Sequence, residues 1–300
     1  MVLQNPTGAP ISPGTFGTLA HKHLVALSEV IGSRTPGSSA EVRAAEYIRE
    51  VFQEYGYMPQ VQSFSFVTEN EEKLKSVNVI ALKPGLSSKE IIVGAHYDSI
   101  NIGQGADDNA SGVAVLLEVA DLLRNSQPGY TIRMIAFGGE EEDLDGSRYF
   151  VRQMNRVDIK NTIGMINLDS LIAGDILYVY GDAGAGTLRD WILNKAKQKG
   201  FDLEGRTAAE LDENDGTPCD CADYGPFQEA GIPFAYFEAT NWNLGEDAMT
   251  QVNPRYGEEG EIRHTKFDRM DYLNATFPNR IQEHLNEVIS LLYETLVQFK

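Results

Sequence analysis

Apolar residues along the chain follow two spacings, one typical of helices and the other of strands. Apolar positions three or four residues apart predict amphipathic helices between polar or glycine-rich segments. We expect these helices over residues 18–31, 38–55, 110–124, 146–155, 187–199 and 279–299. Short alternating or continuous apolar runs predict strands. We expect these strands over residues 60–67, 76–82, 90–96, 131–139, 162–170, 176–181 and 233–239.

The order of these elements indicates an α/β fold. The segments IIVGAH, RMIAFGG and TIGMINLD are almost continuously apolar, as expected of strands that are buried on both faces. Strands that alternate with helices form a sheet covered on both sides. We therefore predict a single-domain α/β/α sandwich with a central mixed, mostly parallel β-sheet over residues 18–300. Residues 1–17 are rich in Pro and Gly and predict an extended arm, and residues 200–226 predict a long irregular loop.

Polar side chains occur where three of the apolar strand segments end. His96 closes one strand, Glu140 and Glu141 follow a second, and Asp169 follows a third. Open α/β sheets bind ligands at the carboxyl ends of their strands. We therefore expect these side chains to meet in one crevice.

Two more residues complete a set of metal-ligand side chains. Asp108 lies in GADDNASG just before an apolar helix, and His264 lies in EIRHTKFDRMDYL near the end of the chain. The whole set is His96, Asp108, Glu141, Asp169 and His264. Two histidines and three carboxylates suit a pair of zinc ions that share a carboxylate bridge. The sequence thus predicts a metallohydrolase.

The residues beside these ligands have chemistry that a metal site uses. Asp98 can accept a hydrogen bond from the second ring nitrogen of His96. Of the adjacent Glu140 and Glu141, one can bind metal while the other takes a proton from water. Each motif alone also has an ordinary explanation: a loop histidine, a helix N-cap cluster or a solvated acidic turn. Their joint occurrence at strand ends favours the metal site.

Charge and cysteine content narrow the class of protein. The formal net charge of −19 argues against a nucleic-acid partner, because phosphate binding needs a basic surface. No run of 18 apolar residues predicts a membrane span, and the first residues lack the layout of a signal peptide. Cys219 and Cys221 are too close in sequence for an unstrained disulfide in most geometries. We expect two thiols without a role.

Taken together, these motifs resemble those of the family-28 metallopeptidases, the co-catalytic dizinc aminopeptidases with a zinc-dependent exopeptidase fold. The resemblance covers roughly residues 20–300. Each motif alone is a weak signal, but the combination of motifs is highly specific. The matching segments are SRTPGSSAEVRAAEYI, HYDS, GADDNASG, GGEEEDLDGS, NLD, CADYGPFQEAGIP and HTKFD. It implies a hydrolase that releases N-terminal amino acids from peptides with a free N-terminus.

The resemblance also implies a role for each candidate residue. Asp108 would bridge two Zn²⁺ ions, His96 with Asp169 would complete one site, and Glu141 with His264 would complete the other. Glu140 would be the general base and then the proton donor to the leaving amine, and Asp98 would be the partner of His96. From spacing alone we expect Asp268 to orient His264. The peptide bond after Asp108 is expected to be cis.

Three departures from the family pattern stand out. Arg263 precedes His264 where many members have a Tyr that polarises the substrate carbonyl, which leaves Tyr224 as our candidate for that contact. The run Ala222-Asp223-Tyr224 replaces a common S-D-H, and Asp143 replaces a Gly. The last two departures do not change a predicted ligand.

Several alternatives remain open at the level of sequence. A glutaminyl cyclase shares the fold but uses one zinc, and a binding module of the same fold would be catalytically inactive. A carboxypeptidase or dipeptidase would need a cation such as Arg206 or Arg263 for the substrate carboxylate. Family habit predicts an extracellular or periplasmic monomer. We expect the wall of the specificity pocket between residues 200 and 245, including Tyr224, Phe227 and Trp242.

Overall fold

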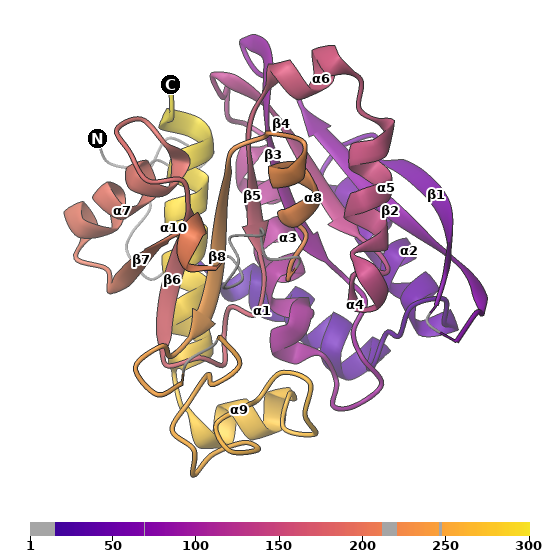
Figure 1. The fold of residues 1–300 in the computed structure, drawn as a ribbon, viewed down its shortest axis with the longest axis vertical. Coiled ribbons are helices and arrows are strands. Elements are labelled where there is room, and N and C mark those ends of the chain that lie inside the picture. The colour runs from indigo at the N-terminus through magenta and orange to yellow at the C-terminus, as the bar shows by residue number, and fades with distance from the viewer. Residues whose placement is uncertain (1–15, 69, 212–220, 246–247) are drawn as a thin grey trace.

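A single mixed sheet forms the centre of the computed structural model, which describes residues 16–68, 70–211, 221–245 and 248–300 (Figure 1). Within these ranges the strands are β1 (Gln60–Val67), β2 (Lys73–Lys83), β3 (Ser87–His96), β4 (Tyr130–Phe137), β5 (Thr162–Leu168), β6 (Ile176–Gly181), β7 (Leu203–Thr207) and β8 (Phe234–Thr240). Their order across the sheet is β1-β2-β4-β3-β5-β8-β6-β7. The central strands β4, β3, β5 and β8 are parallel, whereas β2 and β6 run antiparallel to their central neighbours.

Helices cover both faces of this sheet, which confirms the predicted α/β sandwich (Figure 1). On one face lie α1 (Thr18–Val25), α2 (Ser39–Glu54), α3 (Ser111–Leu123), α7 (Leu188–Lys199) and α10 (Arg280–Gln298). On the other lie α5 (Asp145–Gln153), α6 (Arg156–Asn161) and α8 (Gly225–Glu229). No helix in the described ranges is both long and apolar enough to cross a membrane.

Side-chain alternation along the strands divides the apolar residues between two cores. On β3, Ile91 and Val93 join the larger core, whereas Ile92 joins the smaller one. On β4, Met134 and Ile135 divide in the same way. Because successive side chains of a strand point to opposite faces, a strand buried on both sides must be apolar throughout. This explains the continuous apolar runs in the sequence.

The structure differs from the predicted elements mainly in its short and exposed pieces. β7 lies within the segment that the sequence predicted as a loop, and pairs in parallel with β6 at the edge of the sheet. None of its residues is buried, so it lacks an apolar pattern. Helices that the sequence did not predict include α6, α8, α4 (Glu140–Asp143), α9 (Met270–Thr276) and η3 (Ala208–Glu210), each only one or two turns long. The predicted helix over residues 18–31 ends as the π-helical turn η1 (Ala26–Ile31).

The predicted N-terminal arm lies mostly outside the described residues, which begin at Phe16. Phe16 itself is buried, and the backbone N–H of Gly17 donates to Glu118 Oε1 on α3 at 2.9 Å. Ala20 N–H donates to Glu118 Oε2 at 2.6 Å. The end of the arm is thus joined to the core, while the division of the chain at residue 17 stays a prediction.

Candidate metal centre

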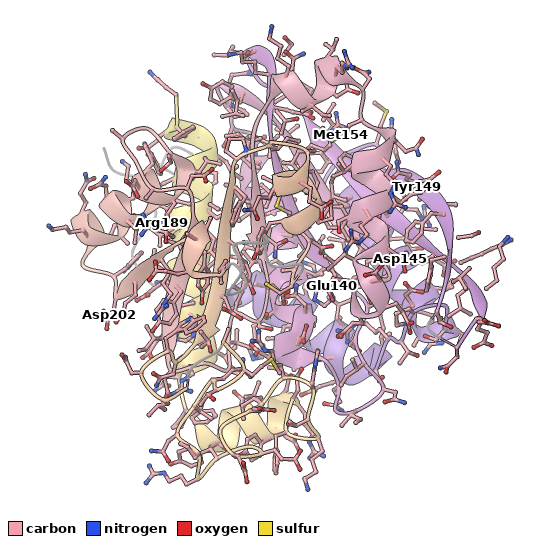
Figure 2. The ribbon with its side chains drawn as sticks, in the orientation of Figure 1. Glu140, Asp145, Tyr149, Met154, Arg189 and Asp202 are labelled. Carbon is pink, nitrogen blue, oxygen red and sulfur yellow. The ribbon has the colours of Figure 1, made fainter. Side chains whose placement is uncertain are left out.

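Strand ends and two loops position the predicted metal ligands. His96 is the last residue of β3, and Asp169 directly follows β5. Glu140 begins α4, after two glycines that follow β4, and Figure 2 shows it near the middle of the molecule. Asp108 comes from the turn η2 (Ala106–Ala110) before α3, and His264 from the loop between β8 and α9.

The five predicted ligands meet in two groups that share Asp108. His96 Nε2 lies 3.1 Å from Asp108 Oδ1 and 3.5 Å from Asp169 Oδ1. His264 Nε2 lies 3.0 Å from Asp108 Oδ2 and 3.1 Å from Glu141 Oε2. In each group the candidate ligand atoms lie within 4.8 Å of one another. The two oxygens of Asp108 therefore face different histidines.

The chemistry of these side chains fits a bound metal ion. Both ring nitrogens of His96 are buried and lack a well-aligned hydrogen-bond partner. Yet Nε2 points among carboxylate oxygens of Asp108, Asp169 and Glu140, the last at 3.8 Å. Imidazole nitrogens and carboxylate oxygens together form the donor set that zinc prefers. The arrangement is that of a metal site rather than of a hydrogen-bonded core histidine.

Buried charge makes the metal-free centre electrostatically unfavourable. Burial raises the pKa of Glu140 well above its usual value, and burial followed by the charge of Asp108 raises the pKa of Glu141 to about 7. Hydrogen bonds from His264 to Asp108 and Glu141 raise the pKa of His264 to about 11. A cation that binds here relieves carboxylate repulsion and displaces these protons, so its affinity falls as the pH falls.

The two predicted supporting carboxylates lie beside the ligands but contact different groups. Asp98 Oδ1 lies 3.7 Å from His96 Nδ1, and its Oδ2 accepts a hydrogen bond from the backbone N–H of Glu141 at 3.1 Å. The spacing had suggested that Asp268 orients the His264 ring, but Asp268 contacts two backbone N–H groups instead. Its Oδ1 and Oδ2 accept from the backbone N–H groups of Asp107 and Asp108 at 2.6 and 3.2 Å, so it fixes the shared carboxylate instead.

Hydrogen bonds from the Asn109 side chain to backbone groups hold the turn that carries Asp108. The Asp108–Asn109 peptide bond is cis, as expected. Asn109 Nδ2 donates to the Leu168 carbonyl at 2.8 Å, and Asn109 Oδ1 accepts from Gly112 N–H at 2.8 Å. A Cβ atom at Gly112 would lie 2.4 Å from the Leu168 oxygen, so only glycine allows α3 to begin this close to β5.

No sequence pattern indicated the role of Arg34, which lies behind the candidate metal centre. It is fully buried and donates to five backbone carbonyls, those of Leu27, Gly32, Tyr97, Gln104 and Gly105. Its charge faces Asp268, Asp98, Asp108 and Glu141. Arg34 thus joins the N-terminal segment to the loop after β3 and offsets the negative charge of the centre.

Arg34→Lys should lower the free energy of unfolding by about 3–5 kcal/mol, because lysine keeps the charge but leaves buried carbonyls without donors. Chemical unfolding of the metal-free protein measures this change. Arg43→Lys is the matched control, because Arg43 is exposed on α2 and its guanidinium donates to Ser39 one turn away. Equal stability of the two variants would contradict the structural role of Arg34.

A cavity of about 320 Å³ opens onto this centre. Its lining residues are Asp108, Glu140, Asp169, Ser170, Leu211, Cys221, Tyr236, Glu238, Trp242, Ala248, Met249, Arg263 and His264. Trp242 lines the cavity as expected, but Tyr224 and Phe227 do not; both are fully buried in the smaller core. The Tyr224 hydroxyl lies 3.3 Å from Cys221 Sγ, and its ring stacks on Phe234. The phenol among the described lining residues is Tyr236.

The expectation of two free thiols is wrong for Cys221, which is disulfide-bonded. The only other cysteine of the chain, Cys219, lies outside the described residues. The disulfide lies beside the cavity, since Cys221 is one of its lining residues.

The fold and this site together define a metal-dependent hydrolase: histidine and carboxylate ligands gather at the carboxyl ends of central strands in an α/β sheet. A family model for Peptidase family M28 matches residues 78–289. The chain belongs to this family. The prediction of an enzyme, a metallo-aminopeptidase of the hydrolase class, is confirmed by this membership and by the names of its relatives.

Two relatives and two solved structures illustrate the similarity. The alkaline phosphatase isozyme conversion protein of Escherichia coli K12 is 31% identical over 93% of this chain and 89% of that protein. Aminopeptidase YwaD of Bacillus subtilis 168 is 30% identical over 75% of this chain but 46% of that protein, so the chain spans about half its length.

The structure of BSAP, a zinc aminopeptidase from Bacillus subtilis, matches with a TM-score of 0.73 at 20% identity, over 94% of this chain and 95% of that one. A glutaminyl cyclase from Porphyromonas gingivalis matches with a TM-score of 0.69 at 20% identity, over 94% and 98% of the two chains. At these identities the structural matches show the shared fold alone.

Proposed function

We propose that this chain is a two-zinc aminopeptidase that releases N-terminal amino acids from peptides. The observation that supports this most directly is the pair of ligand groups that meet at Asp108. One group adds His96 and Asp169, and the other adds Glu141 and His264. Zinc ions held there would supply an activated water and positive charge for the oxyanion of the reaction.

Glu140 is the proposed proton carrier. Its Oε2 lies 3.8 Å from His96 Nε2, and its side chain lines the cavity beside the predicted ligands. Burial raises its pKa, which makes its carboxylate a better base for a water proton. The same group then returns the proton to the leaving amine, while Glu140 and Asp169 attract the ammonium of the substrate. The Tyr236 phenol replaces Tyr224 as the proposed contact for the substrate carbonyl.

Two alternatives are less well supported by the contacts in the cavity. For a carboxypeptidase, Arg206 and Arg263 would have to bind a substrate carboxylate. Arg263 is already paired with Glu238, and the guanidinium of Arg206 stacks on the Trp242 ring at 4.1 Å. For a glutaminyl cyclase, one zinc is sufficient, whereas this chain brings together both ligand groups.

The disulfide supports a proposed location outside the cytoplasm. Cys221 is disulfide-bonded, and such bonds persist in oxidising compartments but are rare in the cytosol. One curated relative, from Mycobacterium tuberculosis, is a probable lipoprotein aminopeptidase. We therefore propose an extracellular or periplasmic enzyme.

Metal analysis combined with a substrate panel tests the proposed function. We expect about two zinc ions per chain, cleavage of aminoacyl p-nitroanilides with a free amine, and no cleavage of their N-acetylated forms. Chelation should abolish turnover, and added zinc should restore it. Equal cleavage of blocked substrates would contradict an aminopeptidase. Cyclisation of N-terminal glutamine without hydrolysis of the panel would favour the cyclase.

A further inference from the structure

A buried ion pair forms part of the cavity wall beside the metal centre. Glu238 on β8 is 1% exposed, and its Oε1 lies 2.5 Å from Arg263 Nη1. Arg263 directly precedes the predicted ligand His264, and its side chain is 11% exposed. Both residues line the cavity, although neither belongs to the ligand groups.

Hydrogen bonds join this pair to the apolar part of the cavity lining. Glu238 Oε2 accepts from the Tyr180 hydroxyl at 2.7 Å, and Tyr180 Oη accepts from Trp242 Nε1 at 2.8 Å. Arg263 Nη2 donates to the Ala248 carbonyl at 2.7 Å. The apolar members of this part are Leu211, Trp242, Ala248 and Met249. The ion pair is therefore continuous with the surface that would receive a substrate side chain.

The pair leaves this part of the cavity without net charge. Arg263 neutralises Glu238, and both carboxylate oxygens already accept hydrogen bonds. A charged substrate side chain that entered here would lose water without gaining a counter-charge, which is unfavourable. An uncharged side chain would instead pack against the apolar lining. Specificity arises from such a penalty on the wrong ligand as much as from contacts to the right one.

We propose that the Glu238–Arg263 pair determines the side-chain specificity of the enzyme by selecting uncharged, mainly apolar N-terminal residues. This inference rests on the proposed aminopeptidase function. The pair acts as one neutral unit: removal of either partner exposes the charge of the other. The two single substitutions should therefore shift specificity in opposite directions.

Arg263→Met should raise kcat/KM for lysyl relative to leucyl p-nitroanilide by at least about tenfold, because Glu238 is left unpaired. Glu238→Gln should raise the glutamyl-to-leucyl ratio by a similar factor and leave the lysyl-to-leucyl ratio no higher. The double variant has no charge at this site and should return to the wild-type preference for leucyl substrate. General damage to the fold would lower activity on all substrates. It cannot shift the substrate ratios in opposite directions in the two single variants and restore them in the double variant.

Inhibition by the free amino acids leucine, lysine and glutamate gives a second readout that does not depend on turnover of the charged substrates. Arg263→Lys keeps the positive charge and should keep the wild-type ratios. Arg133→Met is the matched control, because Arg133 forms a 2.9 Å ion pair with Glu90 on the sheet and lines a different cavity. It should not change specificity.

The outcomes separate the two proposals. If the metal-loaded wild type cleaves no free-amine substrate, the proposed function fails. If it cleaves them but prefers lysyl or glutamyl substrate, or if both single variants shift the ratios in the same direction or by less than about twofold, the role of the pair is wrong and the function stands. Should one single variant fail to fold, the other single variant and the double variant still decide the question.

Discussion

Glu140→Gln is expected to keep the full metal content of the wild type and to lose about 10²–10⁴-fold in kcat. The amide has nearly the shape of the carboxylate but cannot take a proton from water at neutral pH. Glu140 lies close to His96 and Glu141, but the two groups that share Asp108 keep all their members without it. Metal binding should therefore survive this substitution. Steady-state kinetics on a leucyl substrate and metal analysis of the same sample measure both quantities.

Asp143→Asn provides the control for Glu140→Gln. Asp143 lies on the same short helix α4, and its exposed side chain lies 3.6 Å from Arg148 Nη2. Because Asp143 is exposed to solvent, its ion pair contributes little to stability, so the variant should retain near-normal turnover. Retention of turnover by Glu140→Gln as well would remove Glu140 from the mechanism.

Asp108→Asn should have the second large effect, and on binding rather than on proton transfer. Both ligand groups include Asp108, and its two oxygens face His96 and His264 separately. Asparagine offers one carboxamide oxygen and an N–H₂ group that cannot bind a cation. We expect metal affinity to fall by at least about 100-fold, with loss of activity after dialysis.

His264→Ala tests whether loss of a ligand that belongs to one group has a smaller effect on metal content than loss of Asp108, which belongs to both. His264 belongs to only one of the two groups anchored on Asp108, so this variant should keep about one metal ion per chain while Asp108→Asn loses both. Metal analysis after identical dialysis distinguishes the two. Identical metal contents in both variants would argue that Asp108 is not shared.

The sequence predicted the part of the site that strand geometry determines. His96, Glu140 and Asp169 follow apolar runs, and parallel strands in one sheet bring their carboxyl ends to a common edge. The pattern of apolar residues therefore places these side chains together without knowledge of any loop. Asp108 and His264 lie on loops, so their residue type and local segments, rather than periodicity, marked them as candidate ligands. The resemblance to the family then implied a role for each.

The sequence did not predict which side chains point into the cavity. Tyr224 and Tyr236 are both buried tyrosines on either side of α8, but only Tyr236 lines the cavity. Glu238 did give a signal, since a carboxylate within the apolar strand PFAYFEA requires a partner. Its partner Arg263 is 25 residues away along the chain. Only the path of the intervening loop brings them together, and that path has no periodic pattern.

The amide side chain of Gln251 connects the segment beside Asp108 to the turn that precedes His264. Its Nε2 donates to Asp107 Oδ2 at 2.6 Å, and its Oε1 accepts from the backbone N–H groups of Ile262 and Arg263 at 3.1 and 2.8 Å. Gln251 thus joins the turn that carries Arg263 and the proposed ligand His264 to Asp107, the neighbour of Asp108. Metal binding at Asp108 and His264 should therefore slow hydrogen exchange at the Ile262 and Arg263 amides together, so that an occupied metal site would also order the Arg263 side of the cavity.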